Sequence, residues 1–571
     1  MTDIFQKHKC ANILVICALL NFSAKGVGHW TPLANSAPNG DAIGTMLMLS
    51  DGTVMAQHLG NSNGVWYRLT PDNTGSYVNG SWTTLHSMNW PRLYYSSDVL
   101  KDGRVFVAGA EESFPGGGDT AEIYDPQNDS AGWTMLSVPN TLIRTNTDGF
   151  SDSESVVLPN GNVLIAPVVP TSGDGTVIYN PDANTWAAGP ASLVYLNEAS
   201  WVKLPDDSIL TTDKDNTHSE RYIPSLNQWI NDAVVPIDTF SNGEIGAAIL
   251  LPNGKAVFFG GSGHTVIYSP SGNTNSGTWA IGPDIPSGVG IADSPAAMMV
   301  NGKILLMVGS SEGDGGNHGT YTFYEYDYSA GNNGTFTVTS SPGNSTIGSV
   351  FNTTDCSCFF RFLDLPDGTV LASFGDNPAG QLYVYTPDGS AVAAGKPNII
   401  SISPNSDGSF HLTGTGLNGI SAGAAFGDDA QMDSNYPLVR LLDENGHIYY
   451  ARSYNWSSTS VMTGTKLVTT EFALPPTVFQ GGAQSYSLSV VANGIASAPV
   501  TFHSSVWVDF NYTGSTQNGT YNTPFKTLAQ GTNAVASGAM ISIKPGTSHE
   551  TTTIAKPMLI TAVGGSATIG H

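Results

Sequence analysis

The chain has 571 residues, of which 40% are hydrophobic and 12% charged, and its formal net charge is −25. This length exceeds what one hydrophobic core serves, so we expect two to four domains. The negative charge repels phosphate backbones and anionic headgroups, so we expect no nucleic-acid partner and no membrane insertion. The 65 glycines, with many Asn, Ser and Thr residues, suit short strands joined by tight turns and predict an all-β fold.

Residues 1–26 predict a signal peptide. Lys7 and Lys9 precede an apolar run over residues 11–20, and small and polar residues follow it at 23–26. This run is too short to span a bilayer, which distinguishes it from a membrane anchor. We therefore expect a secreted protein, either extracellular or at the cell surface.

A turn signature recurs through residues 29–396. It reads Leu, any residue, Asp or Asn, and Gly in most copies, and Asn-Gly and Asp-Gly pairs favour two-residue hairpin turns. The copies lie at residues 49–52, 100–103, 158–161, 204–207, 251–254, 300–302 and 365–368. A Tyr-x-Pro corner and a Trp follow most turns, and the clearest pairs are Tyr124 with Trp133, Tyr179 with Trp186, Tyr222 with Trp229 and Tyr268 with Trp279. These residues resemble the kelch motif, and seven copies predict a seven-bladed β-propeller.

The seventh repeat is incomplete at its C-terminal end. Tyr385 and Pro387 form its corner, but no Trp follows before Pro397. A matching Trp30 stands at the other end of the repeat region, within residues 29–33. We expect the N-terminal strand to complete the last blade and close the ring, which removes an exposed sheet edge.

Two further segments follow the predicted propeller. Residues 397–503 alternate as antiparallel strands do and predict an immunoglobulin-like β-sandwich. A kelch propeller followed by such a sandwich resembles the galactose oxidase and glyoxal oxidase family. Residues 506–571, with a short helix start at 523–528, resemble the first coils of a right-handed parallel β-helix of the pectate-lyase type. Such coils need about three repeats to bury a core, so we expect them to pack on the sandwich, on another subunit or on further coils of a longer chain.

The family resemblance implies a copper radical oxidase, whose centre needs a cysteine cross-linked to a tyrosine, a Tyr-His pair and a histidine on the C-terminal domain. The first blades contain no cysteine, and Cys358 and Phe359 stand where the Tyr-His pair is expected. Only His447 remains as a candidate copper ligand, and residues 444–446 before it equally predict an exposed hairpin tip. One histidine does not hold copper. We therefore expect no catalytic residues and no cofactor, with copper as the alternative.

Cys356 and Cys358 are the two cysteines that remain after the signal peptide is removed. Their Cys-x-Cys spacing permits a disulfide, a soft-metal site or a pair of free thiols. A disulfide or a pair of structural thiols is the preferred interpretation, and the sequence leaves the redox state of the pair open.

The leading hypothesis is a secreted, non-catalytic binding or surface-interaction protein with a carbohydrate ligand. Aromatic side chains near the rim loops, Trp90, Tyr94, Tyr95 and Phe114, suit stacking on sugars, although packing between blades is an equally natural role. The expected partners are a polysaccharide or an extracellular or cell-surface protein. The alternative function is a degenerate oxidoreductase related to galactose oxidase. A polysaccharide-degrading enzyme is a third hypothesis, but the predicted coils are too short to supply a cleft.

Overall fold

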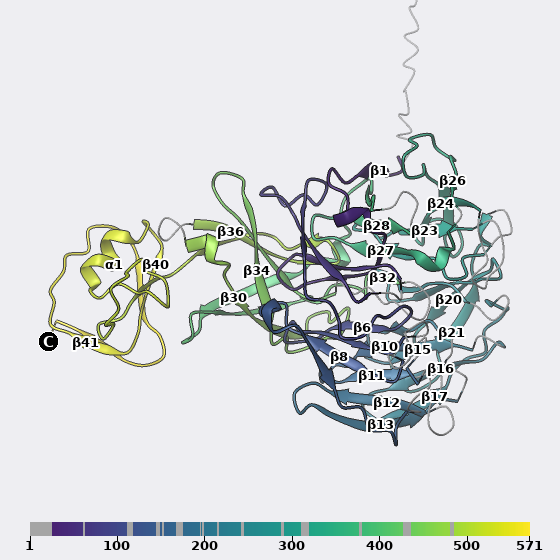
Figure 1. Cartoon of the computed structure of the whole chain (residues 1–571), viewed down its shortest axis with the longest axis horizontal. Coiled ribbons are helices and arrows are strands. Elements are labelled where there is room, and N and C mark those ends of the chain that lie inside the picture. The colour runs from purple at the N-terminus through teal and green to yellow at the C-terminus, as the bar shows by residue number, and fades with distance from the viewer. Residues whose placement is uncertain are drawn as a thin grey trace, which may run out of the picture.

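The computed structural model describes residues 26–570 apart from fifteen short internal segments. These segments are 61–62, 111–117, 144–148, 151–152, 167–174, 194–195, 197–198, 214–215, 241–244, 287–289, 310–318, 354, 376–379, 426–434 and 480–484. The predicted signal peptide lies outside the described residues except for Gly26. The fold is all-β, and Figure 1 shows a propeller, a middle sheet domain and a C-terminal unit arranged along the longest axis. Within the described ranges, no helix is long and apolar enough to cross a membrane.

The propeller has seven blades, each an antiparallel sheet of four strands. Blades one to four contain β2 (Ile43–Met48), β3 (Val54–His58), β4 (Trp66–Thr70) and β5 (Ser81–Thr84); β6 (Ser96–Val99), β7 (Val105–Ala108), β8 (Ala121–Tyr124) and β9 (Trp133–Leu136); β10 (Glu154–Val157), β11 (Val163–Ala166), β12 (Gly175–Asn180) and β13 (Thr185–Ala191); β14 (Val202–Lys203), β15 (Ile209–Thr212), β16 (Ser219–Ile223) and β17 (Gln228–Asn231). Blades five to seven contain β18 (Ala248–Leu250), β19 (Ala256–Phe259), β20 (Thr265–Ser269) and β21 (Thr278–Ile281); β22 (Ala296–Met298), β23 (Ile304–Val308), β24 (Thr320–Asp327) and β25 (Thr335–Val338), with β26 (Phe351–Asn352) paired to β24; β27 (Phe360–Asp364), β28 (Val370–Phe374), β29 (Tyr383–Thr386) and β1 (His29–Pro32).

Strand β1 closes the ring as predicted. It pairs antiparallel with β29, and Trp30 lies opposite Tyr385 with 4.9 Å between ring centroids. The Trp30 indole N–H also donates to the carbonyl of Ser340 in the neighbouring blade, at 3.0 Å. The first strand in the chain is therefore the outermost strand of the last blade.

The Tyr and Trp residues of the repeat lie directly opposite each other on the third and fourth strands. Their ring centroids are 5.0 Å apart in Tyr124–Trp133, 4.6 Å in Tyr179–Trp186, 5.5 Å in Tyr222–Trp229 and 4.9 Å in Tyr268–Trp279. Such cross-strand aromatic pairs stabilise a sheet beyond the apolar area that they bury. These aromatic pairs therefore hold the outer half of blades two to five.

The hairpin between the first two strands of each blade needs a residue with positive φ. Glycine supplies it in six blades, with φ between 76° and 89° at Gly52, Gly103, Gly161, Gly254, Gly302 and Gly368. In blade four the position is Asp207, with φ of 70°. A side chain in this region costs about 1 kcal/mol relative to glycine, so blade four tolerates strain that the other blades avoid.

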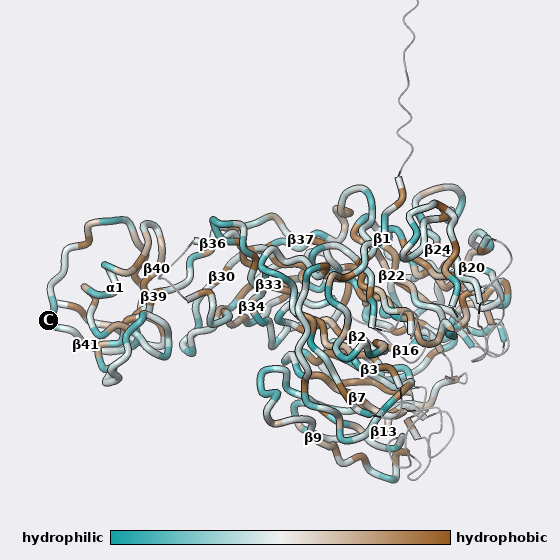
Figure 2. Tube along the Cα trace, turned by 45° about the horizontal axis from the view of Figure 1, so that its top comes forward, coloured by the Kyte–Doolittle hydropathy of each residue, from teal (hydrophilic) through white to brown (hydrophobic). Residues whose placement is uncertain are grey.

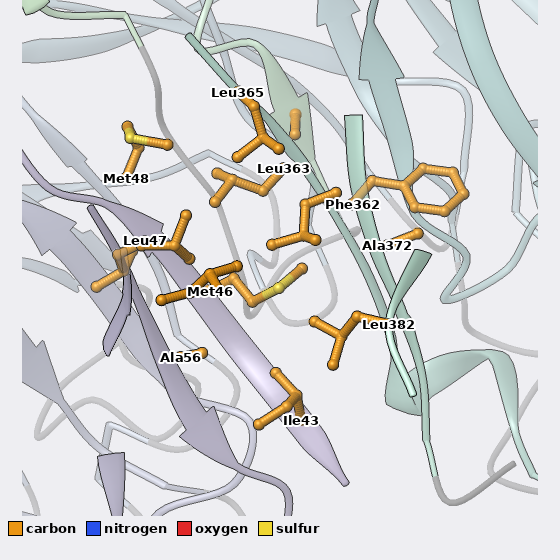
Figure 3. Close-up of a cluster of buried hydrophobic side chains, with 14 of the residues drawn as sticks. Ile43, Met46, Leu47, Met48, Ala56, Phe362, Leu363, Leu365, Ala372 and Leu382 are labelled. Carbon is orange, nitrogen blue, oxygen red and sulfur yellow. The ribbon is translucent and has the colours of Figure 1, made fainter. Parts of the chain in front are cut away.

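Buried apolar side chains fill the spaces between blades. Figure 2 shows hydrophobic segments gathered in the interior of the propeller and hydrophilic ones in outer turns. Where the ring closes, β2 packs against β27, and Met46 and Leu47 of blade one face Leu363 and Leu365 of blade seven (Figure 3). The joint at which the ring closes is thus as apolar as an ordinary protein core.

The middle domain is one continuous sheet wrapped around its own core. Its strands are β30 (Asn398–Pro404), β31 (Phe410–Thr415), β33 (Leu438–Leu442), β34 (Ile448–Tyr454), β35 (Leu467–Ala473), β36 (Ser485–Ala492), β37 (Ile495–Ala496) and β38 (Val500–His503). Strand β34 changes partner along its length, because residues 448–451 pair with β33 and residues 452–454 with β35. The two faces of the predicted sandwich are therefore joined through hydrogen bonds rather than separate.

The middle domain covers one face of the propeller, the face that carries the hairpin turns, which we call the turn face. Ser453 donates its backbone N–H to the carbonyl of Ser50, and Lys203 Nζ donates to the carbonyl of Thr459 at 3.0 Å. A short strand, β32 (Ala424–Ala425), extends from the middle domain to the propeller axis and pairs with β22. The opposite face carries the connections between blades, and we call it the connection face.

The C-terminal unit contains parallel strands, unlike the rest of the chain. Strands β39 (Val506–Val508), β40 (Met540–Ile543) and β42 (Leu559–Ala562) form one parallel ladder, and β41 (Gly546–Ser548) pairs parallel with β43 (Ala567–Ile569). The predicted helix start becomes α1 (Leu528–Ala534), capped by Thr527 and Gln530. Met540 packs against the core of the middle domain. The likeness to pectate lyases stays a prediction.

Candidate functional site

Two loops on the connection face bring aromatic rings together. Tyr94 lies in the loop that enters blade two, and Phe359 lies in the loop that enters blade seven. Their rings are nearly parallel, at 3°, with 6.5 Å between centroids, and both side chains are half-buried. Because blades two and seven flank blade one, the pair extends across the inner end of blade one. We call this pair the aromatic mouth.

Tyr94 has an unusual backbone conformation. Its φ is 54°, in the left-handed region that a bulky side chain rarely occupies. Such strain costs on the order of 1–3 kcal/mol and is concentrated at binding and catalytic sites in proteins. The structure therefore keeps the Tyr94 ring in place at a cost in stability.

A buried ion pair fixes the loop that carries Tyr94. Arg92 and Glu122 meet at 2.8 Å, and both side chains are completely buried. The Glu122 carboxylate also accepts the backbone N–H groups of Asn89, at 2.9 Å, and Trp90, at 3.3 Å. Charge-assisted hydrogen bonds of this kind are strong, so the loop is held rigidly and leaves the Trp90 side chain half-buried.

The loop that carries Phe359 is fixed by a disulfide and by hydrogen bonds. Cys356 and Cys358 form a disulfide, both side chains are buried, and no thiolate remains there for a soft metal. The Arg361 guanidinium donates to the carbonyl of Cys358 at 2.6 Å, and Ser357 Oγ donates to the carbonyl of Ala292 in blade six at 3.1 Å. Phe359 is therefore presented from a second rigid loop.

The structure divides the four aromatic residues that were predicted to contact a ligand. Trp90 and Tyr94 lie on the connection face, half-buried, as a ligand contact requires. The prediction for Tyr95 is wrong, because its side chain is 1% exposed within the core and its hydroxyl donates to Gln57 Oε1 at 2.6 Å. Phe114 lies outside the described residues.

His447 lies at the exposed hairpin tip that residues 444–446 predicted, away from the propeller centre. It ends the β33–β34 hairpin turn, is 41% exposed, and its Nδ1 lies 3.2 Å from Asp443 Oδ2. The next residue, Ile448, donates its N–H to Asn73 in an outer loop of blade one. The segment that does reach the axis is β32. Among the described residues, no group of three His, Cys, Asp or Glu side chains is placed to bind a metal.

A buried polar cluster lies at the propeller axis, and the sequence did not reveal it. Asp98 Oδ2 accepts a hydrogen bond from Ser155 Oγ at 2.7 Å, and burial raises the pKa of Asp98 to about 6, although the charge of Lys203 opposes this rise. A cavity of about 20 Å³ lies beside Ser155 and Lys203, and Asn435 of the middle domain lines it. A cavity of this size admits about one water molecule. The cluster therefore joins the propeller to the middle domain.

No family model matches the sequence, and no curated protein matches it either. Among solved structures, the chain is similar to a fungal alcohol oxidase of the AA5 family in complex with copper, at 14% identity and a TM-score of 0.48, over 84% of this chain and 99% of that one. It is also similar to a streptogramin B lyase, at 12% identity and a TM-score of 0.42, over 63% of this chain and 98% of that one. A third similar structure is virginiamycin B lyase from Staphylococcus aureus, at 12% identity and a TM-score of 0.41, over 63% of this chain and 100% of that one. These values carry no conclusion about activity, and the seven-bladed fold follows from the strand pairing itself.

Sequence reasoning missed Phe359 as a site residue. Phe359 entered the sequence analysis only as a residue that stands where the Tyr-His pair of the copper centre is expected. The adjacent Cys356 and Cys358 nevertheless indicated a constrained loop. A loop that is tied at both ends presents its next side chain in a fixed position, and here that side chain is an aromatic ring.

Proposed function

We propose that the protein is a secreted, non-catalytic propeller that binds carbohydrate at the aromatic mouth. The observation that carries the proposal is the strained backbone of Tyr94, whose ring lies parallel to that of Phe359 on the connection face. The C–H face of a pyranose ring packs on such aromatic surfaces, which combine apolar area with a polar edge.

Rigidity of both loops supports the proposal. The Arg92–Glu122 ion pair fixes one ring, and the Cys356–Cys358 disulfide fixes the other. Binding to a preformed site avoids the entropy cost of ordering its side chains, so even a small aromatic site binds usefully.

A non-catalytic role is proposed because the residues that the family resemblance implies for catalysis are replaced. Cys358 is joined in a disulfide and Phe359 is apolar, so neither offers a copper ligand. Measuring the copper content of the purified protein tests this part, and stoichiometric copper would refute it.

Glycan-array screening of the purified protein, followed by calorimetry on the best glycan, tests carbohydrate binding. Tyr94→Ala is expected to weaken binding at least tenfold, whereas Tyr94→Phe keeps the stacking surface and is expected to stay within threefold of the wild type. Tyr94→Gly removes the ring and relieves the backbone strain, so it should bind poorly while unfolding at the same or a higher temperature. Trp82→Ala, on the outer strand of blade one, is the control.

Loss of binding in Tyr94→Ala but not in Trp82→Ala supports the aromatic mouth. Equal binding in all four variants would show that any glycan binds elsewhere. Secretion is tested separately by N-terminal sequencing of exported protein, which should begin near residue 27 if the predicted signal peptide is removed.

A further inference from the structure

Basic side chains join neighbouring blades at a recurring place on the turn face. In four of the seven seams, a Lys or Arg of one blade contacts the corner loop of the next blade, which is the segment that follows its third strand. The contacts are Arg68 with the carbonyl of Pro126 at 2.9 Å, Lys101 with Asp182 at 2.6 Å, Arg221 with the carbonyl of Asn275 at 2.6 Å, and Lys303 with Asp388 at 3.7 Å. We call these contacts the corner clamps.

Two positions of the repeat supply most of the clamps. One is the residue directly after the hairpin turn, which is Lys303 in blade six and also Arg104 in blade two, whose guanidinium donates to the carbonyl of Pro181 at 3.3 Å. The other is the residue before the corner tyrosine or its equivalent, which is Arg68 in blade one and Arg221 in blade four.

Blade three, like blade seven with Thr369 and Val384, has a basic residue at neither position. Asn162 follows its hairpin turn, and Ile178 precedes its corner tyrosine. Both line a groove of about 520 Å³ between blades three and four, which extends to the blade-four corner at Pro224. The volume is within the range of ordinary ligand sites. Among the described residues, this seam is one of three without a corner clamp, and the groove lies along it.

The groove is acidic. Its lining includes Asp206 and Asp207 and no Lys or Arg. Asp206 lies 3.4 Å from Arg221, but Asp207 forms no ion pair with any residue that the structure describes. Asp207 is also the residue that replaces the turn glycine, so blade four accepts backbone strain and places a carboxylate here. Strain of this kind points to a functional position.

We propose that the groove between blades three and four binds a basic side chain, a guanidinium or ammonium group, of a protein partner. The partner's cation takes the position that Lys101 and Arg104 occupy after blade two and Lys303 after blade six. There it contacts the corner loop of blade four and the Asp207 carboxylate. The chain's net charge of −25 steers a basic segment toward it. This proposal does not depend on carbohydrate binding at the aromatic mouth, which lies on the opposite face.

Saturation-transfer NMR on the full chain tests the proposal, with the peptide acetyl-Gly-Arg-Gly-amide as probe and acetyl-Gly-Gln-Gly-amide as its neutral match. We expect signal at the arginine side-chain protons, about fivefold or more above the glutamine peptide, and a marked decrease at 0.5 M salt. Asn162→Arg places an arginine of the protein itself in the groove as a clamp. It should therefore abolish the arginine-peptide signal and raise the unfolding temperature. Asn253→Arg adds the same charge on an exposed turn of blade five and should leave the signal unchanged.

Asp207→Gly separates binding from stability. It removes the carboxylate and the strain together, so it should weaken the arginine signal while the protein becomes more stable. A signal that survives in Asn162→Arg would overturn the proposal, and so would equal signals from the two peptides. If neutral disaccharides bind the wild type but not the Asn162→Arg variant, the cationic ligand class is overturned, because the groove is then a second sugar site.

Discussion

The axial carboxyl group of Asp98 gives a pH dependence that can be worked out in advance. Its side chain is 1% exposed, and burial raises its pKa from 3.8 to about 6. The folded chain therefore holds this proton more tightly than the unfolded chain does. The group favours folding at low pH, and that contribution is lost as the pH rises from about 4 through 6.

The size of the effect follows from the change in pKa. One pKa unit corresponds to about 1.4 kcal/mol, so the change from 3.8 to about 6 lowers the free energy of unfolding by about 3 kcal/mol at neutral pH. Asp98→Asn removes the titration and keeps the shape, and its amide can still accept the hydrogen bond from Ser155. We expect this variant to be more stable than the wild type at pH 7.5, by up to about 3 kcal/mol, and to lose that advantage at pH 4.

Guanidinium unfolding of both proteins between pH 4 and pH 8 measures this difference, because titrations elsewhere in the chain cancel between them. Asp125→Asn, at the exposed corner of blade two, serves as a control outside the axis. A difference between the Asp98 variant and the wild type that stays constant from pH 4 to pH 8 would refute the reasoning. It would show that Asp98 ionises in the folded chain much as it does in the unfolded one.

Three further predictions concern stability. Asp207→Gly should stabilise the protein by about 0.5 kcal/mol in denaturant unfolding, because relief of the positive-φ strain exceeds the added entropy of the unfolded chain. The reverse change in blade five, Gly254→Asp, meets no neighbouring atoms and should destabilise the protein. Trp30→Ala should cost about 3 kcal/mol and open the ring, detected as proteolysis of β1 before the rest of the propeller; simultaneous cleavage of both would contradict this. Replacing Cys356 and Cys358 with serine should cost only about 1.5 kcal/mol, because the disulfide closes a very short loop, and a loss of folding would show a wider structural role.

The architecture was predictable because its signals repeat. One hairpin turn proves little, but seven in register fix the blade count, and the missing Trp after Tyr385 identified β1 as the closing strand. The partner change within β34 was not predictable, because residues 448–454 alternate in the same way whether they pair with one neighbour or two.

The candidate site was predicted less well, for physical reasons. Tyr94 and Tyr95 are adjacent aromatic residues with the same composition signal, yet one lies at the surface and the other in the core. Whether each side chain lies at the surface or in the core depends on where β6 begins and on the positive φ of Tyr94. Neither feature is visible in the residue pattern. For His447, the turn residues before it correctly indicated a hairpin tip, whereas its role as a copper ligand was implied by the family resemblance alone.

Ring closure by β1 also constrains how the protein is made. His29 pairs with Thr386, so one of the first strands to leave the ribosome has no partner until almost the whole propeller has been synthesised. At ordinary elongation rates this delay is on the order of half a minute. Throughout that time β1 has no strand beside it in its own blade, and its unpaired backbone groups are a hazard for mispairing with another chain. A chaperone that holds the N-terminal segment, or an export route that keeps the whole chain unfolded, would therefore increase the yield of closed rings more than any change within the blades.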